Sequence, residues 1–320
     1  MSPSEPGQEA TTHPSVVKAV AREVVRLGAK VIIADSPGGG SAISEQILKN
    51  LYTKTGMINL HKLKNVKLNY DTSYFEAPNP KGFIKKYKLM SVLKQADKII
   101  NVPKVKTHML TTLTCSVKNL FGLIPGRDKI SYHTRFKDVN DFSRMLIDLA
   151  VLVKPTLTIV DGVIGMEGQG PSFGKKKELG LIIAGTNVFE TDSAVCDIIG
   201  FKAETVPYLK AALDRNLFKK EEYDVKKYKV KFAEPHADIL RKLWNVCPSS
   251  IKDMMSNIWL DVPNITSKCI GCGMCRDSCP ESAITITNNK ASINYKKCIR
   301  CYCCYELCRY NAITLKKKIF

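Results

Sequence analysis

Short apolar runs alternate with segments of helical periodicity over the first two thirds of the chain. Apolar residues fall on one helical face from Val16 to Leu27, and Gly28 is placed to end that helix. The apolar residues 31–34 then predict a buried strand, followed by a helix from about Ser41 to Lys54. Further runs of strand length are residues 98–102, 157–160 and 181–184. Because helical stretches separate most of these runs, the pattern predicts an α/β fold with a largely parallel sheet and flanking helices.

Polar or glycine-rich segments follow the predicted strands. They comprise residues 35–40, 103–108, 161–171 and 186–192. In open α/β sheets, ligands bind beyond the carboxyl ends of the strands, so we expect these segments to converge on one site. Residues 36–40 have neither the G-x-G-x-x-G order of a dinucleotide fingerprint nor the G-K-[ST] ending of a P-loop. We therefore predict neither NAD nor ATP as the ligand.

Residues 98–137 are strongly basic. They contain six Lys and two Arg against the single acid Asp128, which gives a net charge of +7 with His neutral. A basic cleft favours an anionic small molecule, and we predict that Lys104, Lys106 and Lys118 bind it. The alternative is that these lysines only solvate surface loops.

Candidates for proton transfer lie in or near the same segments. We predict that His108 or His133 supplies protons to the bound molecule. Three carboxylates are candidates for general acid–base work or for a second metal, namely Asp161, Glu167 and Asp192. His13 stands at the start of the first predicted helix, where it either caps the helix or contacts the substrate.

The last 52 residues contain nine of the twelve cysteines, and eight of them form two copies of C-x-x-C-x-x-C-x-x-x-C. The copies are residues 269–279 and 298–308, so the chain repeats itself after 29 residues. The first three cysteines of such a run wrap one cubane, whereas the fourth points to the other cluster. We therefore predict two 4Fe-4S clusters in a small α+β ferredoxin-like domain. One is bound by Cys269, Cys272, Cys275 and Cys308, and the other by Cys298, Cys301, Cys304 and Cys279.

Zinc is the alternative metal, because C-x-x-C pairs also bind it. Its sites use four ligands and do not add a third cysteine at the same spacing, so the pattern favours iron–sulfur clusters. Cys303 is a ninth thiol in this region, and we interpret it as structural rather than as a ligand. Arg309 stands where the first copy has Pro280, a change that removes no ligand. Asn288 and Asn289 predict the turn of a short apolar hairpin over the clusters.

The formal net charge of +19 raises the question of a nucleic-acid partner. Eight thiolates around two cubane cores would lower it by about 4 charges. Neither an aromatic–basic stacking pattern nor a helix-turn-helix signature accompanies the charge, so we predict no nucleic-acid binding. No apolar run approaches the roughly 18 residues of a membrane span, and the first residues lack the order of a secretory signal. Together with the metal-type cysteine spacing, these features predict a cytoplasmic location.

Three motifs resemble those of the domain of unknown function 362 family. They are N-V-P-K-V-K-T-H at 101–108, S-V-K-N-L-F-G-L-I-P-G at 116–126 and I-V-D-G-V-I-G-M-E-G-Q-G-P at 159–171. The resemblance runs from Thr11 to about Tyr208, and residues 266–315 resemble the bacterial two-cluster ferredoxins. It implies an α/β protein of a kind often fused to ferredoxin domains, without an established activity. Similar members begin with a strand bearing a Lys-Pro-Asn element, which implies that a first strand is missing here.

We expect three parts in the chain: an α/β domain over residues 1–205, a helical connection over 206–265 and a two-cluster ferredoxin domain over 266–320. The connection is predicted to pack between the two domains, with a lid over the site as the alternative. The predicted function is an iron–sulfur oxidoreductase that relays electrons to an anionic small molecule. The alternative is a non-catalytic electron carrier or cluster-delivery protein whose α/β domain docks a partner protein.

Overall fold

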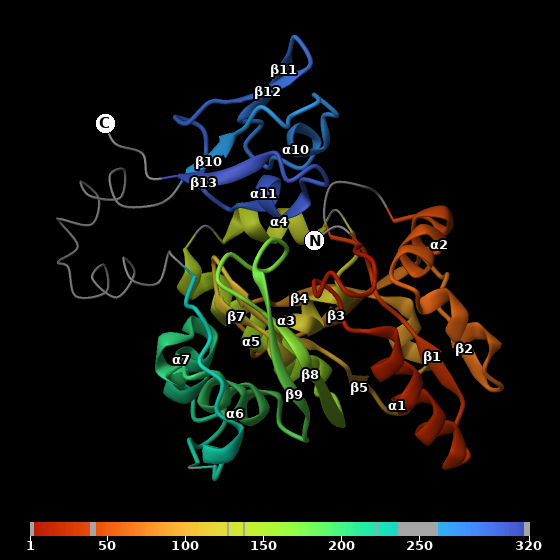
Figure 1. Ribbon diagram of the computed structural model, residues 1–320. Helices are drawn as coiled ribbons and strands as arrows, with labels where there is room; N and C mark the ends of the chain where they lie inside the picture. The colour runs from red at the N-terminus through yellow and green to blue at the C-terminus, as the bar shows by residue number, and fades with distance from the viewer. Residues whose placement is uncertain are drawn as a thin grey trace.

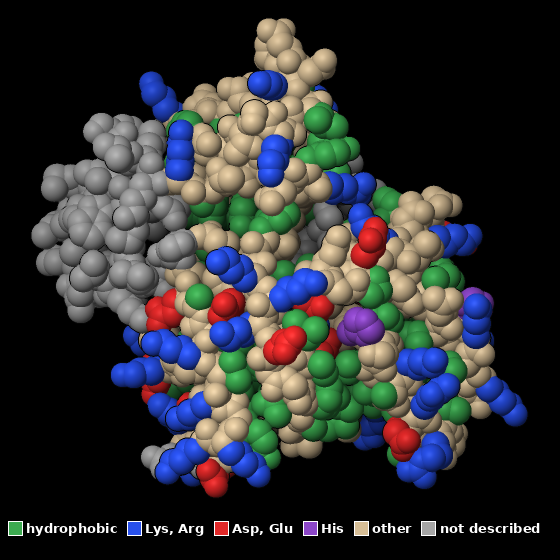
Figure 2. Space-filling view, viewed as in Figure 1, with side chains coloured by type: hydrophobic (Ala, Val, Ile, Leu, Met, Phe, Trp, Pro, Cys, Tyr) green, Lys and Arg blue, Asp and Glu red, His purple; other side chains and the backbone are tan. Residues whose placement is uncertain are grey.

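The computed structural model describes residues 3–38, 43–126, 128–136, 138–221, 223–235 and 262–316. The larger part of the chain forms an α/β unit, and residues 262–316 form a small unit stacked against one end of it (Figure 1). No helix among the described residues is both long and apolar enough to cross a membrane. On the face shown in Figure 2, Lys and Arg side chains are spread over both units, with Asp and Glu between those of the larger one.

A five-stranded sheet forms the centre of the α/β unit. Its strands are β5 (Ile100–Asn101), β6 (Lys104–His108), β7 (Thr112–Thr114), β8 (Leu157–Glu167) and β9 (Lys175–Gly185). The long strand β8 runs parallel to β5 and β6, whereas β9 and β7 add antiparallel edges. The predicted α/β class with a parallel-rich sheet is therefore confirmed.

Two details of the predicted strands are wrong. The apolar run at 98–102 ends at Pro103, which has no N–H for the ladder, but the chain resumes as strand β6 directly afterwards. Residues 104–108 and 161–167 are therefore strand residues and do not belong to loops beyond the strands. Residues 181–184 lie in β9, which pairs antiparallel with β8 in a long hairpin.

Helices cover the sheet and close the main core. They are α3 (Ser116–Asn119), α4 (Asp128–Arg135), α5 (Val139–Val153), α6 (Val188–Ile199) and α7 (Pro207–Asp214). Asp138 caps the first turn of α5, and its apolar face buries Phe142 and Leu146 fully. Each such side chain contributes about 1.5–3 kcal/mol by leaving water. Of the predicted helical connection, α7 packs against α5, whereas residues 236–261 lie outside the described residues.

The N-terminal elements form a separate layer with its own core. They are α1 (Pro14–Arg26), β1 (Val31–Ile33), α2 (Glu45–Lys54) and β2 (Val66–Leu68). Strands β1 and β2 pair parallel and form a two-stranded sheet of their own. Leu48 and Tyr52 of α2 are fully buried against them. Within the described strands, β1 and β5 do not pair, and the two line the same cavity. The missing first strand stays a prediction.

The remaining elements of the α/β unit are short. One hairpin consists of β3 (Tyr74–Pro78) and β4 (Lys86–Met90). The 3-10 helices are η1 (Met57–Lys62), η2 (Ser91–Gln95), η3 (Leu120–Leu123), η4 (Ala203–Thr205) and η5 (Lys226–Tyr228).

The C-terminal unit repeats one pattern twice. Its elements are β10 (Val262–Ile265), α10 (Met274–Asp277), β11 (Ile284–Thr287), β12 (Lys290–Ile293), α11 (Cys303–Leu307) and β13 (Ile313–Lys316). Strand β10 pairs antiparallel with β13, and β11 with β12. Asn288 and Asn289 both adopt positive φ, the conformation that a two-residue hairpin turn requires, so the predicted hairpin is present.

Candidate functional site

Predicted cluster ligands line a small cavity inside the C-terminal unit. They are Cys279, Cys298, Cys301 and Cys304, and Cys303, Ile284 and Ile293 line the same cavity. Burial raises the pKa of the Cys304 thiol, and the nearby thiols of Cys301 and Cys298 raise it further. This is the group predicted to bind the second cluster.

The other four thiols form a matching group. Burial raises the pKa of Cys275 to about 11, and the neighbouring thiols of Cys269, Cys272 and Cys308 add to the effect. The repeat is visible in the backbone donors, because Ala283 N–H and Ala312 N–H donate to the sulfurs of Cys279 and Cys308 at 3.2 Å. Such N–H···S bonds are among the features that tune iron–sulfur clusters.

Four cysteine thiols in each group are a donor set that fits a cubane cluster. In a cubane each thiolate binds a different iron, so the four sulfurs stand farther apart than four ligands of one ion. Over the residues that the structure describes, no three His, Cys, Asp or Glu side chains could hold a metal ion together. Bound iron would deprotonate the ligating thiols despite their raised pKa values. A cluster at each group would supply one-electron transfer, and the ligand sets stay a prediction.

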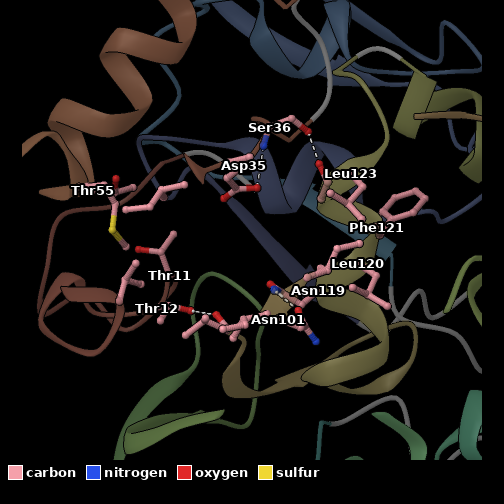
Figure 3. Close-up of a pocket in the computed structure, with 18 of the residues that line it drawn as sticks. Thr11, Thr12, Asp35, Ser36, Thr55, Asn101, Asn119, Leu120, Phe121 and Leu123 are labelled. Carbon is pink, nitrogen blue, oxygen red and sulfur yellow. Dashed lines mark hydrogen bonds between the residues drawn. The ribbon is translucent and has the colours of Figure 1, made fainter. Parts of the chain in front are cut away.

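A cavity of about 960 Å³ runs along β1 and β5 and past their carboxyl ends. Its walls include the N-terminal segment at Thr11 and Thr12, the loop after β1 at Asp35 and Ser36, and residues 119–123 after α3 (Figure 3). Part of its wall comes from the C-terminal unit, namely Cys303, Glu306 and Leu307. The two units therefore share one cavity.

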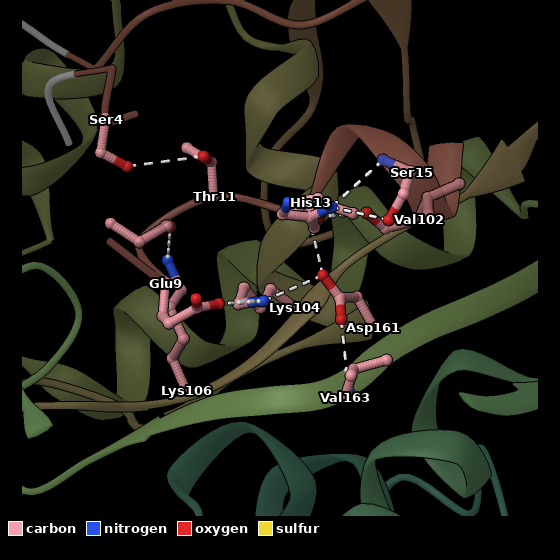
Figure 4. A network of polar contacts seen from close by, with 12 residues as sticks. Ser4, Glu9, Thr11, His13, Ser15, Val102, Lys104, Lys106, Asp161 and Val163 are labelled. Carbon is pink, nitrogen blue, oxygen red and sulfur yellow. Dashed lines mark hydrogen bonds and ion pairs between the residues drawn. The ribbon is translucent and has the colours of Figure 1, made fainter. Parts of the chain in front are cut away.

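Lys104 lines this cavity, but its ammonium group already pairs with two carboxylates of the protein. Its ammonium group lies 2.7 Å from Glu9 Oε2 and 2.9 Å from Asp161 Oδ2, and all three side chains are at most 4% exposed (Figure 4). Asp161 also accepts the backbone N–H of His13 at 2.8 Å. Lys104 and Asp161 therefore form an internal ion pair, and their predicted roles in anion binding and acid–base chemistry stay predictions. The pair holds the N-terminal segment against β6 and β8.

Lys106 and Lys118 are the other two predicted anion-binding lysines. Both line the cavity, and Lys106 also donates to the carbonyl oxygen of Ala10. Burial lowers the pKa of Lys106 to about 7, and the nearby positive charge of Lys118 acts in the same direction. Burial also lowers the pKa of Lys118, whose ammonium lies 5.9 Å from the centre of the Phe121 ring. An anion between these groups would relieve their mutual repulsion.

Lys129 is a cavity lysine that the sequence analysis did not single out. It extends from α4 and donates to the carbonyl oxygens of Ser36 and Pro37, at 2.9 and 3.1 Å. Burial lowers the pKa of Lys129 to about 8, although the nearby Asp35 carboxylate opposes the shift. Burial raises the pKa of Asp35, with Lys129 again the main opposing influence. The only sequence signal was the excess of basic residues at 98–137.

Both predicted histidines are buried and neutral. Nδ1 of His108 accepts the N–H of Leu110 at 3.0 Å, so the ring carries its proton on Nε2, which lies 3.4 Å from Glu306 Oε1. Burial keeps the pKa of His108 well below its usual range. Burial lowers the pKa of His133 to about 3, and its ring stacks on Phe142 with centres 4.6 Å apart. Burial thus disfavours the imidazolium form of both rings, and their predicted role as proton donors stays a prediction.

The two remaining carboxylates lie away from the cavity. Asp192 is fully buried and accepts the N–H groups of Ser116 and Val117, at 2.7 and 3.1 Å, and the hydroxyl of Tyr208 at 2.9 Å. Burial raises the pKa of Asp192, and these bonds oppose the shift. Glu167 accepts the N–H of Ala233 at 2.9 Å. Asp192 thus holds the start of α3 and Glu167 holds the segment at Ala233, while their predicted catalytic roles stay predictions.

His13 takes the capping role that the sequence left open. It is the N-cap of α1, and its Nδ1 accepts the backbone N–H of Ser15 at 3.2 Å. Cys303 is buried, lies between two predicted cluster ligands in the sequence, and lines both the thiol cavity and the larger cavity.

Replacement of Asp192 tests its structural role. We expect Asp192→Ala to lower the free energy of unfolding by about 3 kcal/mol, because two buried N–H groups lose their acceptor. Tyr208→Phe is the control and should cost about 1 kcal/mol, since it removes one hydrogen bond and leaves the carboxylate in place. Urea unfolding followed by circular dichroism measures both. An Asp192→Ala protein as stable as the unmodified chain would contradict the assignment.

Comparisons with known proteins agree with this architecture. A family model described as "Domain of unknown function (DUF362)" matches residues 1–197, and a model described as "4Fe-4S dicluster domain" matches residues 262–309. The chain is also 35% identical over 209 residues to the "Thylakoid-associated protein sll1697" of Synechocystis sp.. That match covers 65% of this chain and 63% of the relative, so less than two thirds of the relative's length is spanned. The cytoplasmic location stays a prediction.

The resemblances inferred from the sequence motifs are confirmed, since the two family models match the same two parts of the chain. The first of them covers more than half of the 320 residues. The C-terminal match establishes an iron–sulfur electron-transfer domain of the ferredoxin type. The chain therefore belongs to the DUF362 family and joins that domain to a 4Fe-4S dicluster domain.

Proposed function

We propose that this protein is an oxidoreductase that passes electrons through two 4Fe-4S clusters to a small anionic molecule held in the shared cavity. The observation that carries the proposal is the composition of the cavity wall. Lys106, Lys118 and Lys129 line it from the α/β unit, and Cys303 and Glu306 line it from the cluster-binding unit. A ligand in the cavity would thus lie against both the basic groups and the helix that carries predicted cluster ligands.

An anion is favoured because the cavity lysines destabilise one another in its absence. Charged groups around Lys106 come from several elements: Lys104 beside it on β6, Lys118 on α3, Asp35 after β1 and Glu306 on α11. Lys129 faces Asp35 and Lys118. Desolvation is the main influence that lowers the pKa values of Lys106, Lys118 and Lys129. A bound anion would stabilise the charged forms that burial disfavours.

The lysines also replace the histidines as candidate proton donors. A group transfers protons best when its pKa lies near the working pH. The pKa of Lys106 is about 7 and that of Lys129 about 8, so both exchange protons near neutrality. Reduction of a bound molecule consumes protons together with electrons, and these two ammonium groups lie where such protons are needed.

Metal content tests the cluster part of the proposal. Protein purified without oxygen should contain about eight irons and eight sulfides per chain. Cys303→Ser should leave the iron content unchanged, whereas Cys279→Ser should damage the cluster bound mainly by residues 298–304 and Cys308→Ser the cluster bound by residues 269–275. Stoichiometric zinc with little iron would refute the clusters, and equal iron loss from Cys303→Ser would refute the ligand assignment.

Anion binding tests the cavity. We expect one member of a panel of phosphates and carboxylates, beginning with inorganic phosphate, to raise the free energy of unfolding by about 2.7 kcal/mol at a hundredfold excess over its dissociation constant. Lys118→Gln should weaken this effect at least tenfold in affinity, because a charge-assisted hydrogen bond of about 1.5–3 kcal/mol is lost. Lys176→Gln, on the exposed surface of β9, is the matched control and should change nothing. If no anion stabilised the protein, the carrier alternative would replace the enzyme.

The affinity of the cavity for an anion is expected to fall as the pH rises. Sulfate keeps its charge between pH 6 and 9, so its affinity reports the lysines alone. We expect its affinity to fall as pH rises through about 7 to 8, by up to about tenfold per pH unit, because Lys106 and then Lys129 lose their protons. Calorimetric titrations at each pH measure how the affinity for sulfate changes with pH. In Lys106→Met the decrease near pH 7 should be absent. A constant affinity would show that the anion does not meet these groups.

A further inference from the structure

The internal repeat allows the two halves of the C-terminal unit to be compared residue by residue. Helices α10 and α11 occupy equivalent places, because each begins one residue before the third cysteine of its motif. Arg276 and Asp277 of α10 correspond to Tyr305 and Glu306 of α11, 29 residues later. Arg276 and Asp277 pair with each other at 2.8 Å on the surface, with both side chains more than half exposed. The first half therefore keeps its polar helix in solvent.

The second half turns the equivalent helix toward the α/β unit. The ring of Tyr305 packs on Phe173 with centres 5.1 Å apart, and its hydroxyl donates to the carbonyl oxygen of Gln169 at 3.0 Å. The hydroxyl of Ser172 donates to the carbonyl oxygen of Glu306 at 3.3 Å. Residues 169–173 of the α/β unit thus form one side of the surface on which α11 packs.

The end of strand β6 forms the other side of this packing surface. Nε2 of His108 lies 3.4 Å from the carboxylate of Glu306, and Met109 is 1% exposed within the apolar core of the C-terminal unit. Contacts from two segments of the α/β unit therefore cover α11, whereas Arg276 and Asp277 of α10 stay exposed. The two motifs therefore have the same cysteine spacing but are surrounded by different neighbours.

The shared cavity follows the same asymmetry. Those described residues of the C-terminal unit that line it are Cys303, Glu306 and Leu307, and all belong to α11. Cys303 and Glu306 lie on the same short helix as the predicted ligand Cys304, so this wall carries a carboxylate beside the second motif. Both lysines on the opposite wall, Lys106 and Lys118, also feel this carboxylate. The wall thus joins the second motif directly to the basic groups.

The first motif, by contrast, faces solvent. The predicted ligand Cys272 is exposed, and Ile270 between the first two ligands is 54% exposed. A cluster held there would lie within reach of another protein's redox centre without any change in the structure.

We infer that the two clusters have different roles: the one at Cys298, Cys301, Cys304 and Cys279 exchanges electrons with the cavity, and the one at Cys269, Cys272, Cys275 and Cys308 exchanges them with an external one-electron carrier protein. The inference rests on the proposed function for the direction of flow. One electron moves in each step, so the carrier is oxidised by one electron and the cavity ligand is reduced by one. A two-electron reduction needs two carrier encounters and takes up its protons inside the cavity.

Glu306 affects how readily the cluster at the second motif accepts an electron. Its negative charge lies in a buried wall beside the second motif and disfavours the addition of an electron there. Asp277, its counterpart in the first half, is exposed and screened by water. The two acids are therefore a matched pair in which one charge acts on its cluster and the other does not.

The test uses the full chain, purified without oxygen and carrying its clusters. Redox titration followed by electron paramagnetic resonance should resolve two signals in the unmodified protein. Glu306→Gln should shift one midpoint potential upward and leave the other unchanged, whereas Asp277→Asn should shift neither measurably. Cys301→Ser and Cys272→Ser assign the signals, and the signal altered by Cys301→Ser should be the one that Glu306→Gln shifts.

A second measurement needs no variant. A neutral gadolinium chelate in solution speeds the relaxation of a nearby cluster, so it should affect one signal several-fold more than the other. The signal protected from gadolinium must be the one that Glu306→Gln shifts. Equal effects of the chelate on both signals, or a shift confined to the gadolinium-sensitive signal, would overturn the inference. These readouts need no ligand in the cavity, so failure of anion binding with the asymmetry intact would refute only the proposed function.

Discussion

Burial of lysine in the central sheet is the constraint on which the rest of this structure depends. Lys104 and Lys106 lie on β6 and are each 4% exposed, a position that an ammonium group occupies only when partners compensate its lost hydration. Those partners come from other parts of the chain: Glu9 and Ala10 from the N-terminal segment and Asp161 from β8. The need to satisfy the lysines therefore draws the N-terminal segment across the end of the sheet.

This placement has two consequences for the cavity. The N-terminal segment continues into α1 through His13, whose backbone N–H is held by Asp161 and whose ring caps the helix, so α1 and the cavity wall are positioned by the same ion pair. Because Lys104 is paired internally, the proposed anion would meet Lys106, Lys118 and Lys129, which also line the cavity. The cavity wall is still basic, but its basic character comes from Lys106, Lys118 and Lys129 and not from Lys104.

Burial decides the chemistry of the cavity in the same way. Desolvation disfavours charge, so it leaves the histidines neutral and moves two lysines to pKa values near neutrality. The usual assignment of histidine as the proton donor and lysine as a fixed charge is therefore reversed. The C-terminal unit completes the cavity from the other side, where α11 supplies Cys303 and Glu306. Electrons, protons and an anion would meet in one enclosed volume.

The local patterns of the sequence determined the parts whose structure depends on near neighbours. Cysteine spacing predicts the thiol groups because each triad lies within one short loop, and Asn288 with Asn289 predicts a hairpin because the two tolerate positive φ. Alternating apolar runs predict the α/β class because burial of one face has a fixed period along a strand or helix. These inferences need no knowledge of distant residues.

Only the tertiary structure decided the partners of the charged groups. Lys104 and Asp161 are 57 residues apart, and Asp192 meets Ser116 from 76 residues away, so no spacing rule reveals that these groups satisfy one another. The same limit applies to the repeat: its two motifs have identical cysteine spacing, yet packing against Phe173, His108 and Met109 buries α11 and leaves α10 in water. Residue type sets what a group can do, whereas its burial and its distant partners decide what it does.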